Sequence, residues 1–119
     1  MTQHDTNVRL RHMLDYAHEA RKMVQDKTRT NLDSDRLLTL ALVRVMEVIG
    51  EAASRVPQDD KDKYRDIEWS GIVGLRNRLI HGYDVINLDL LWQIIQKDIP
   101  PLIKALENIP DVKALSDDI

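Results

Sequence analysis

The middle of the chain gathers side chains that can carry out acid–base and phosphate chemistry. Residues 74–83 read GLRNRLIHGY and include Arg76, Arg78 and His81. Histidine is the side chain whose ordinary pKa, about 6.5, suits proton transfer at neutral pH, while arginine binds phosphate or carboxylate through paired N–H groups. The combination favours a site for an anionic ligand. The alternative for a histidine near a helix end is a capping or exposed residue that contacts terminal carbonyls.

The helical spacing of this region predicts which side chains share a face. Ile72, Leu75 and Leu79 recur at threes and fours and form an apolar stripe, which Tyr83 continues if the helix persists. Glycine in a helix costs about 1 kcal/mol relative to alanine, so glycines on the other face indicate close approach of a bundle helix or of a substrate. That other face is predicted to hold Ser70, Gly71, Gly74, Asn77, Arg78 and His81.

Glu47 and Glu51 form a second group of candidate residues. They share a helix face with Arg44 and Arg55, and a like-charge pair four residues apart is unfavourable unless cations lie nearby. Arg76 or Arg78 would supply such a cation, and Arg76 is predicted at the edge of the apolar stripe, where a partly buried guanidinium needs carboxylate partners. The alternative is a structural ion-pair network that the two arginines of the same helix close.

A metal site is a further interpretation of the same carboxylates. Glu47, Glu51, His81 and Asp84 are residue types that bind divalent cations, but their spacing is not diagnostic. A metal-dependent nucleotide hydrolase that uses the two glutamates is therefore a third class of function, beside a nuclease and a binding module.

The composition limits the classes of protein that the chain can be. Its 119 residues are 43% hydrophobic and 31% charged, which is typical of one globular domain over residues 1–119. The absence of cysteine excludes disulfide frameworks, thiolate metal sites and cysteine nucleophiles. No signal region or apolar run of membrane length is present, so a soluble cytoplasmic protein without membrane contact is expected. A net charge of −3 means that any RNA contact must be local.

The positions of proline and apolar residues predict an all-α, up-and-down bundle of four to five helices. Apolar residues recur at helical spacing, and no strand pattern of useful length is present. In the second helix, Asp33 or Ser34 is the expected N-cap, Leu37 is expected on the core face, and Pro57 closes the helix. The proline pair at 100–101 must break or kink the fourth helix. The predicted helices cover about 7–25, 34–56, 69–81, 87–99 and 102–109, with Gly82 capping the third and a frayed tail after 110. Residues 58–65 are predicted as a charged surface loop, with a short helical turn as the alternative.

The run from Gly74 to Tyr83 resembles the R-x4-H-x-Y motif of the HEPN superfamily, in the minimal form found in HepT-like ribonuclease toxins of HEPN/MNT toxin–antitoxin systems. The similarity extends over most of the chain, from about residue 37 to residue 109. The other segments that resemble the family are Arg44 with Ile49-Gly50-Glu51-Ala52 on the second helix, Trp69 before the motif helix, and the stretch from Leu88 to Pro100.

The resemblance implies a helical bundle that forms a homodimer, or a higher even-numbered oligomer, through the motif helix. It also implies a metal-independent endoribonuclease that needs no cofactor. Arg76 and His81 would be the catalytic pair, facing their counterparts across a cleft shared by two copies. The histidine would assist attack of the ribose 2′-hydroxyl on the phosphodiester or protonate the leaving 5′-oxygen, while the arginine would stabilise charge on the phosphoryl oxygens. The implied supporting or substrate-binding residues are Asn77, Arg78, Glu47 and Glu51.

The resemblance further implies a type VII toxin–antitoxin system, in which the cognate antitoxin is a minimal nucleotidyltransferase (MNT). Such partners attach AMP to the motif tyrosine, which is Tyr83 in this chain. Adenylate beside His81 would place negative charge and bulk at the RNA cleft and so neutralise the toxin. The main alternative is a non-catalytic interaction or nucleotide-binding module that serves as the accessory subunit of a nucleotidyltransferase.

The spacing of the catalytic pair limits the geometry of such a site. Residues five apart on a regular helix point about 140° apart, so Arg76 and His81 of one chain would not share a face. Either the helix ends before His81, which Gly82 permits, or the site combines residues of two chains. The second option predicts that a monomer is inactive.

Overall fold

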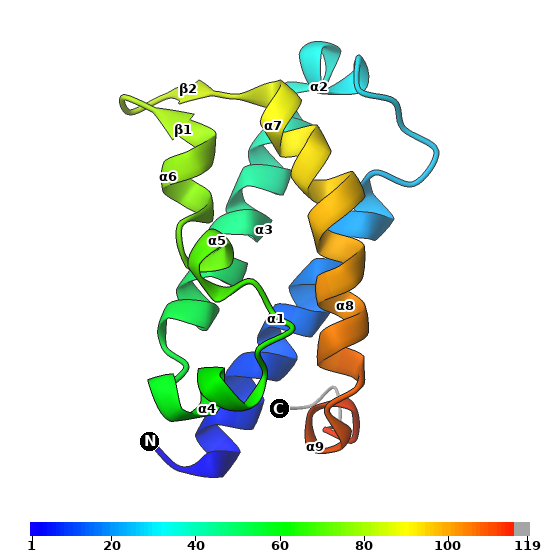
Figure 1. Ribbon diagram of the computed structural model, residues 1–119. Helices are drawn as coiled ribbons and strands as arrows, with labels where there is room; N and C mark the ends of the chain where they lie inside the picture. Colours follow the sequence, from blue (N-terminus) through cyan, green and yellow to red (C-terminus); the bar gives the residue numbers. More distant parts are fainter. Residues whose placement is uncertain (116–119) are drawn as a thin grey trace.

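The chain folds into a bundle of helices with a short β-hairpin at one corner (Figure 1). The computed structural model describes residues 1–115, over which the predicted all-α class is confirmed. The N-terminus and α9 lie at the opposite end of the molecule from the hairpin. In chain order the elements are α1 (Gln3–Met23), α2 (Asn31–Ser34), α3 (Arg36–Ser54), α4 (Gln58–Lys63), α5 (Trp69–Val73), α6 (Leu75–Leu79), β1 (Ile80–His81), β2 (Val85–Ile86), α7 (Leu88–Gln93), the π-helical turn η1 (Ile94–Asp98), α8 (Ile99–Glu107) and α9 (Pro110–Lys113).

The core lies where α1 packs against α3 and α8 (Figure 1). Each of these helices carries buried apolar residues at spacings of three and four, which places them on one inward face. Removing these side chains from water is the dominant favourable contribution to folding. Fully buried side chains of the three helices include Leu10, Met13, Leu42, Met46, Ile49 and Leu106. No helix within residues 1–115 is long and apolar enough to cross a membrane.

A capping box at the N-terminus of α1 extends this helix beyond its predicted start. The helix begins at Gln3, ahead of the predicted residue 7. The Thr2 hydroxyl accepts a hydrogen bond from the Asp5 N–H at 3.1 Å, and the Asp5 carboxylate accepts one from the Thr2 N–H at 3.2 Å. Hydrogen bonds from the backbone and then the side chain of Thr2 lower the pKa of Asp5. The polar first turn is therefore helical without contributing to the apolar pattern.

The start of α3 lies two residues later than predicted, and an apolar residue of its first turn is exposed. Asp35, rather than Asp33 or Ser34, is the N-cap, and its carboxylate accepts a hydrogen bond from the Leu38 N–H at 3.0 Å. The two residues before it belong to the short helix α2. Leu37 is 81% exposed, so its predicted place on the core face is wrong.

The segment from Trp69 to Ile86, which carries the motif and is called the motif segment, departs most from the predicted elements. The single helix predicted over 69–81 is instead two short helices, α5 and α6, followed by the strand β1. Gly74 separates the two helices, with φ −88° and ψ 7°. α6 ends at Leu79, because the backbone of Ile80 is extended, with φ −113° and ψ 125°.

The β-hairpin explains why the helix ends before the histidine. Ile80 pairs with Ile86, and His81 pairs with Val85, in an antiparallel register. Gly82 has a φ of 66°, a left-handed conformation that glycine adopts without steric cost, and it turns the chain. Gly82 thus forms the hairpin turn, and its predicted role as a helix cap is wrong. Both strands of the hairpin contain β-branched residues, which favour strand conformation.

The prolines at 100 and 101 do not break the chain's last long helical run as predicted. α7, η1 and α8 follow one another without interruption from Leu88 to Glu107, and the prolines occupy the first turn of α8. Prolines lack the backbone N–H that a regular helix uses. The π turn accommodates them, because the Ile99 N–H donates to the Ile94 carbonyl five residues back instead of four. Arg21 of α1 stabilises this turn from outside, donating to the Ile95 carbonyl at 3.3 Å and to the side-chain oxygen of Gln96 at 2.9 Å.

Two segments outside the long predicted helices form short helices that pack on the bundle. The segment 58–65 includes α4, which confirms the short helical turn, and Asp60 in it is buried and accepts a hydrogen bond from the Thr6 hydroxyl at 3.1 Å. The tail predicted to fray after residue 110 forms α9, which buries Val112. Residues 116–119 of that predicted tail lie outside the described part of the chain.

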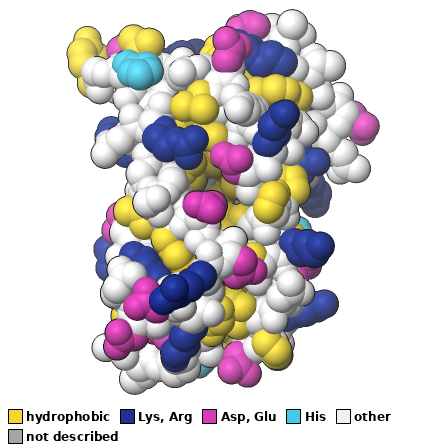
Figure 2. Space-filling view, viewed as in Figure 1, with side chains coloured by type: hydrophobic (Ala, Val, Ile, Leu, Met, Phe, Trp, Pro, Cys, Tyr) yellow, Lys and Arg dark blue, Asp and Glu magenta, His cyan; other side chains and the backbone are white. Residues whose placement is uncertain are grey.

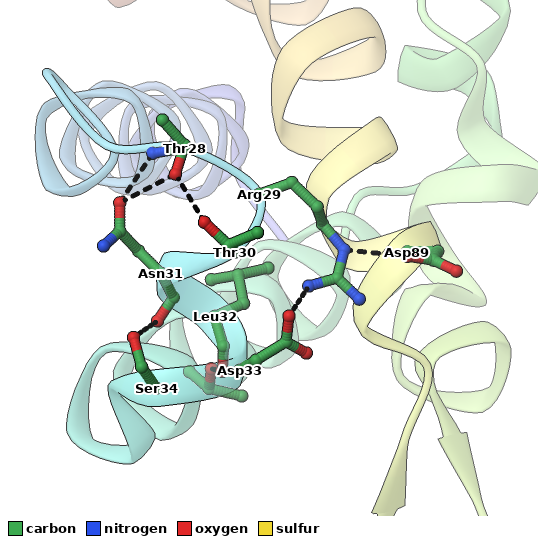
Figure 3. Close-up of polar contacts among 9 residues, drawn as sticks. Thr28, Arg29, Thr30, Asn31, Leu32, Asp33, Ser34 and Asp89 are labelled. Carbon is green, nitrogen blue, oxygen red and sulfur yellow. Dashed lines mark hydrogen bonds and ion pairs between the residues drawn. The ribbon is translucent and has the colours of Figure 1, made fainter.

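The connection between α1 and α3 anchors the base of the hairpin (Figure 3). Arg29 donates through Nε to Asp89 at 2.8 Å, and its Nη1 lies 3.1 Å from Asp33 as an ion pair without hydrogen-bond alignment. The hydrogen bond to Asp89 is the main factor that raises the pKa of Arg29. Asp89 lies in the first turn of α7, and the Asn87 N–H just before it donates to the Leu79 carbonyl at 2.8 Å. The hairpin is therefore fastened where its two strands leave the bundle.

Candidate functional site

The motif segment is held against α3 by a close approach at Gly50. A Cβ atom at this position would lie 2.9 Å from the Ile72 carbonyl oxygen and 3.5 Å from that of Val73. Only glycine leaves room for backbone at this distance, so Gly50 sets how closely α5 packs on α3. Leu75 and Leu79 of α6 are buried below it and complete the attachment.

The glycines of the motif segment do not have the predicted role within one copy of the chain. A Cβ at Gly71 would meet the Arg78 side chain at 3.4 Å, and a Cβ at Gly74 would meet the Ser70 carbonyl at 3.4 Å. Both neighbours belong to the same segment. The close helix approach predicted for these glycines is therefore found at Gly50 instead.

Four predicted site residues meet in one surface pocket of about 350 Å³ between α3 and the motif segment. Arg76 and Asn77 of α6 line one side, and Glu47 and Glu51 of α3 line the other. Arg76 is exposed, so the prediction of a partly buried guanidinium is wrong. The remaining lining residues of this motif pocket are Arg44, Gly50, Ser54 and Val73.

The two glutamates have the intrahelical partners that the structural interpretation predicts. Arg44 Nη1 lies 3.7 Å from Glu47, and Arg55 Nη2 lies 3.0 Å from Glu51. Arg44, Glu47 and Glu51 belong to α3, and Arg55 is its C-cap. Arg76 adds a second cation to the motif pocket beside Arg44, so two arginines and two glutamates line it and its formal charge is balanced.

Arg78 is directed away from the motif pocket. Its Nη1 donates to the Gly71 carbonyl at 3.4 Å, and its side chain lines a different pocket of about 380 Å³ between α5, η1 and α8. Arg76 and Arg78 lie two residues apart on α6, so their side chains leave the helix on different sides, and the Arg78 side chain returns toward α5. Arg78 and Asn77, predicted to share a stripe, thus line different pockets.

His81 and Tyr83 project from the bundle on the hairpin. His81 is exposed on β1, and Tyr83 in the turn is 90% exposed. Figure 2 shows a histidine beside hydrophobic side chains at the corner from which the hairpin projects. His81 is not among the residues that line the motif pocket. Within one copy, the predicted catalytic pair therefore lies on consecutive elements, helix and strand, without sharing a pocket.

The acidic residues and histidines do not assemble a metal site in the described chain. Across residues 1–115, no three His, Cys, Asp or Glu side chains gather closely enough to hold a metal ion. Glu47 and Glu51 lie on α3, whereas His81 and Asp84 lie on the hairpin. The four-ligand metal interpretation is therefore wrong for one copy of the chain.

Exposed apolar side chains lie near the candidate site, and none of them was predicted to be exposed. Leu37 and Leu40 are exposed on α3, and they continue the stripe of Arg44, Glu47 and Glu51 at spacings of three and four. Val73 beside the motif pocket and Val85 on the hairpin are also exposed. The exposure of the two leucines could have been predicted from the sequence, because the helical spacing places both of them on the face of the charged residues and not on the face of the core residues.

Over most of its length the sequence matches a ribonuclease family model and proteins that are named as putative or probable ribonucleases. The family model described as “Ribonuclease HepT-like” matches residues 13–109. A “putative RNase” of Methanocaldococcus jannaschii is 32% identical over 109 residues, which cover 92% of this chain and 100% of the relative. A “probable ribonuclease HepT” of Thermococcus cleftensis is 30% identical over 95 residues, covering 76% of this chain and 86% of the relative. No solved structure matches the chain.

Proposed function

The chain belongs to the HepT-like ribonuclease family, and from this membership we propose that it is a metal-independent endoribonuclease whose site is formed by two copies of the chain. The placement of Arg76 and His81 is the observation that best supports the proposal. Both side chains are exposed, and they lie on the consecutive elements α6 and β1. Arg76 lines the motif pocket, whereas His81 lies outside its lining. A second copy facing this surface brings the missing histidine to each arginine.

The proposed chemistry needs one proton acceptor, one proton donor and a stabiliser of phosphoryl charge. One His81 removes the proton from the ribose 2′-hydroxyl as its oxygen attacks the adjacent phosphorus. The phosphorus–5′-oxygen bond breaks, and the second His81, in its protonated form, protonates the leaving oxygen. Arg76 stabilises the charge on the phosphoryl oxygens, and Asn77 donates hydrogen bonds beside it. The products are a 2′,3′-cyclic phosphate and a 5′-hydroxyl.

The exposed apolar residues support a dimer through this same surface. Leu37 and Leu40 on α3, with Val73 and Val85 on the motif segment, are large hydrophobic side chains that a single copy leaves in water. Closed two-fold dimers use one self-complementary surface on both subunits, and apolar contacts dominate their centres. Burying this surface in the dimer would place the motif pockets of both copies at the interface.

We also place the chain in a toxin–antitoxin pair, in which a minimal nucleotidyltransferase transfers AMP to Tyr83. In that step the tyrosine oxygen attacks the α-phosphorus of ATP, pyrophosphate leaves, and the hydroxyl proton passes to solvent or a base of the partner. The support on this chain is the exposure of Tyr83, whose hydroxyl a second enzyme can reach. AMP two residues from His81 would repel RNA phosphates and occupy the entrance to the site.

Co-expression with the proposed nucleotidyltransferase partner is expected to raise the intact mass of the chain by one AMP group. Tyr83→Phe should abolish that mass increase, because it removes only the acceptor hydroxyl. Tyr16→Phe is the matched control, since it changes a half-buried tyrosine of α1. An unchanged mass after co-expression, or a persistent increase in Tyr83→Phe, contradicts modification at this residue.

The proposed activity is tested by incubating the purified, unmodified protein with total cellular RNA in excess EDTA. Cleavage under these conditions supports a metal-independent ribonuclease, and 2′,3′-cyclic phosphate ends support the proposed proton transfers. Absence of cleavage by a folded, dimeric protein contradicts the proposal. The balanced charge of the motif pocket would then favour the alternative of a non-catalytic accessory subunit that binds a nucleotidyltransferase.

A further inference from the structure

A second surface pocket adjoins the motif pocket along α3. It has a volume of about 270 Å³ and lies between α1 and α3. Arg44 and Glu51 line both pockets, so the two adjoin on the outer face of α3, and together they are called the groove. The groove extends from Arg76 on α6 to Arg9 and His12 on α1.

The charge of this second pocket differs from that of the motif pocket. Three arginines, Arg9, Arg44 and Arg55, line it together with a single carboxylate, Glu51. The motif pocket is formally balanced, and the whole chain has a net charge of −3. The α1 side therefore supplies a local excess of positive charge next to the candidate cleavage site.

Arg9 lines this pocket from α1, and its guanidinium is not fully satisfied within the described chain. Its side chain is half-buried, and its Nε is buried without any hydrogen-bond partner within residues 1–115. A buried guanidinium N–H without an acceptor is costly, and such groups in folded proteins usually have a partner. His12 lies three residues further along α1, so it shares a helix face with Arg9 and adds another N–H donor. Arg55 retains free donors beside its ion pair with Glu51, because a guanidinium has five N–H groups.

We propose that the groove between α1 and α3 binds the phosphodiester backbone of single-stranded RNA that extends from the cleavage site. Arg9 and Arg55 contact phosphate oxygens, and His12 contributes a hydrogen bond to the same strand. This inference rests on the proposed ribonuclease function and adds a second contact region, on a helix that carries none of the motif residues. Because backbone contacts carry no sequence information, the groove raises affinity for RNA of any sequence.

The test measures binding of a fluorescein-labelled single-stranded RNA by anisotropy, in the His81→Ala background to prevent cleavage. Arg9→Gln and Arg55→Gln are each expected to weaken binding about threefold to tenfold, and to reduce the slope of log affinity against log salt by about 0.7 for each lost contact. Arg65→Gln is the matched control, since it removes the same charge from an exposed arginine outside the groove. It should change neither quantity.

Cleavage kinetics with intact His81 provide the second measurement. The groove variants should raise KM for a long RNA with little change in kcat, and Arg9→Lys should recover part of the loss because it keeps the charge. If wild type cleaves RNA while Arg9→Gln and Arg55→Gln match Arg65→Gln in affinity, salt slope and KM, the groove inference is overturned and the ribonuclease proposal survives. If the groove variants lose only binding to the nucleotidyltransferase, the groove is a protein contact and the inference is also overturned. If the unmodified wild type neither binds nor cleaves RNA, both proposals fail.

Discussion

Replacement of His81 by alanine is expected to lower kcat for RNA cleavage by about 10²–10⁴-fold, the range typical for loss of a general acid or base. The side chain is exposed on β1, so its truncation removes no buried packing and should leave the fold unchanged. The measurement is single-turnover cleavage of a labelled RNA in excess EDTA, with circular dichroism to verify the fold. His4→Ala is the matched control, because His4 is an exposed histidine on α1, at the opposite end of the molecule.

Mixing experiments then test whether one site takes histidines from two copies. If both are needed, an excess of His81→Ala subunits captures wild-type subunits in inactive heterodimers, and activity falls as the square of the wild-type fraction. Separate sites on each copy would give a linear decrease. Equal cleavage by wild type and His81→Ala would show that the histidine takes no part in the reaction.

Gly50→Ala is expected to destabilise the fold by about 1–3 kcal/mol, the usual cost of overpacking a well-packed contact. The new methyl group would lie 2.9 Å from the carbonyl oxygen of Ile72 and 3.5 Å from that of Val73. Both obstacles are backbone, which cannot move aside as a flexible side chain can. Because α5 and α6 would be displaced from α3, RNA cleavage should fall together with the midpoint of urea unfolding.

Gly71→Ala provides the comparison for this prediction. Its new methyl group would meet only the end of the Arg78 side chain, at 3.4 Å, and alanine is favoured over glycine in a helix. Its stability should therefore equal or exceed that of the wild type. If Gly50→Ala unfolds at the same urea concentration as Gly71→Ala, the close approach at Gly50 does not limit the packing of the motif segment.

The long helices were predictable because their signal is local. Leu10 and Met13 of α1, and Val45 and Ile49 of α3, are buried at the spacing that the amphipathic pattern requires. The burial of Asp60 was not predictable in the same way, since its partner Thr6 lies 54 residues away in sequence. The hairpin was missed because Ile80 and His81 form a strand of two residues, too short to produce an alternating pattern.

The candidate site was predictable in its residue types and only partly in its geometry. The pocket does join Arg76 with Glu47 and Glu51, as the need for charge compensation on α3 indicated. The helical wheel placed Arg78 beside Asn77, but the Arg78 side chain turns back to the Gly71 carbonyl and lines a different pocket. The groove residue Arg9 lies on α1, far in sequence from the motif, and only the packing of α1 on α3 brings it near.

The change from helix to strand between Leu79 and Ile80 sets how the motif can tolerate insertions. Arg76 follows a helical period of 3.6 residues, whereas His81 follows the alternation of a strand, with Ile80 half-buried and His81 exposed. One residue added to β1 would turn the imidazole to the bundle side and expose an isoleucine, while two would restore its direction. A change of one residue in the spacing between arginine and histidine thus reverses the direction of the histidine, whereas a change of two keeps it. We therefore expect this spacing to vary by even numbers of residues.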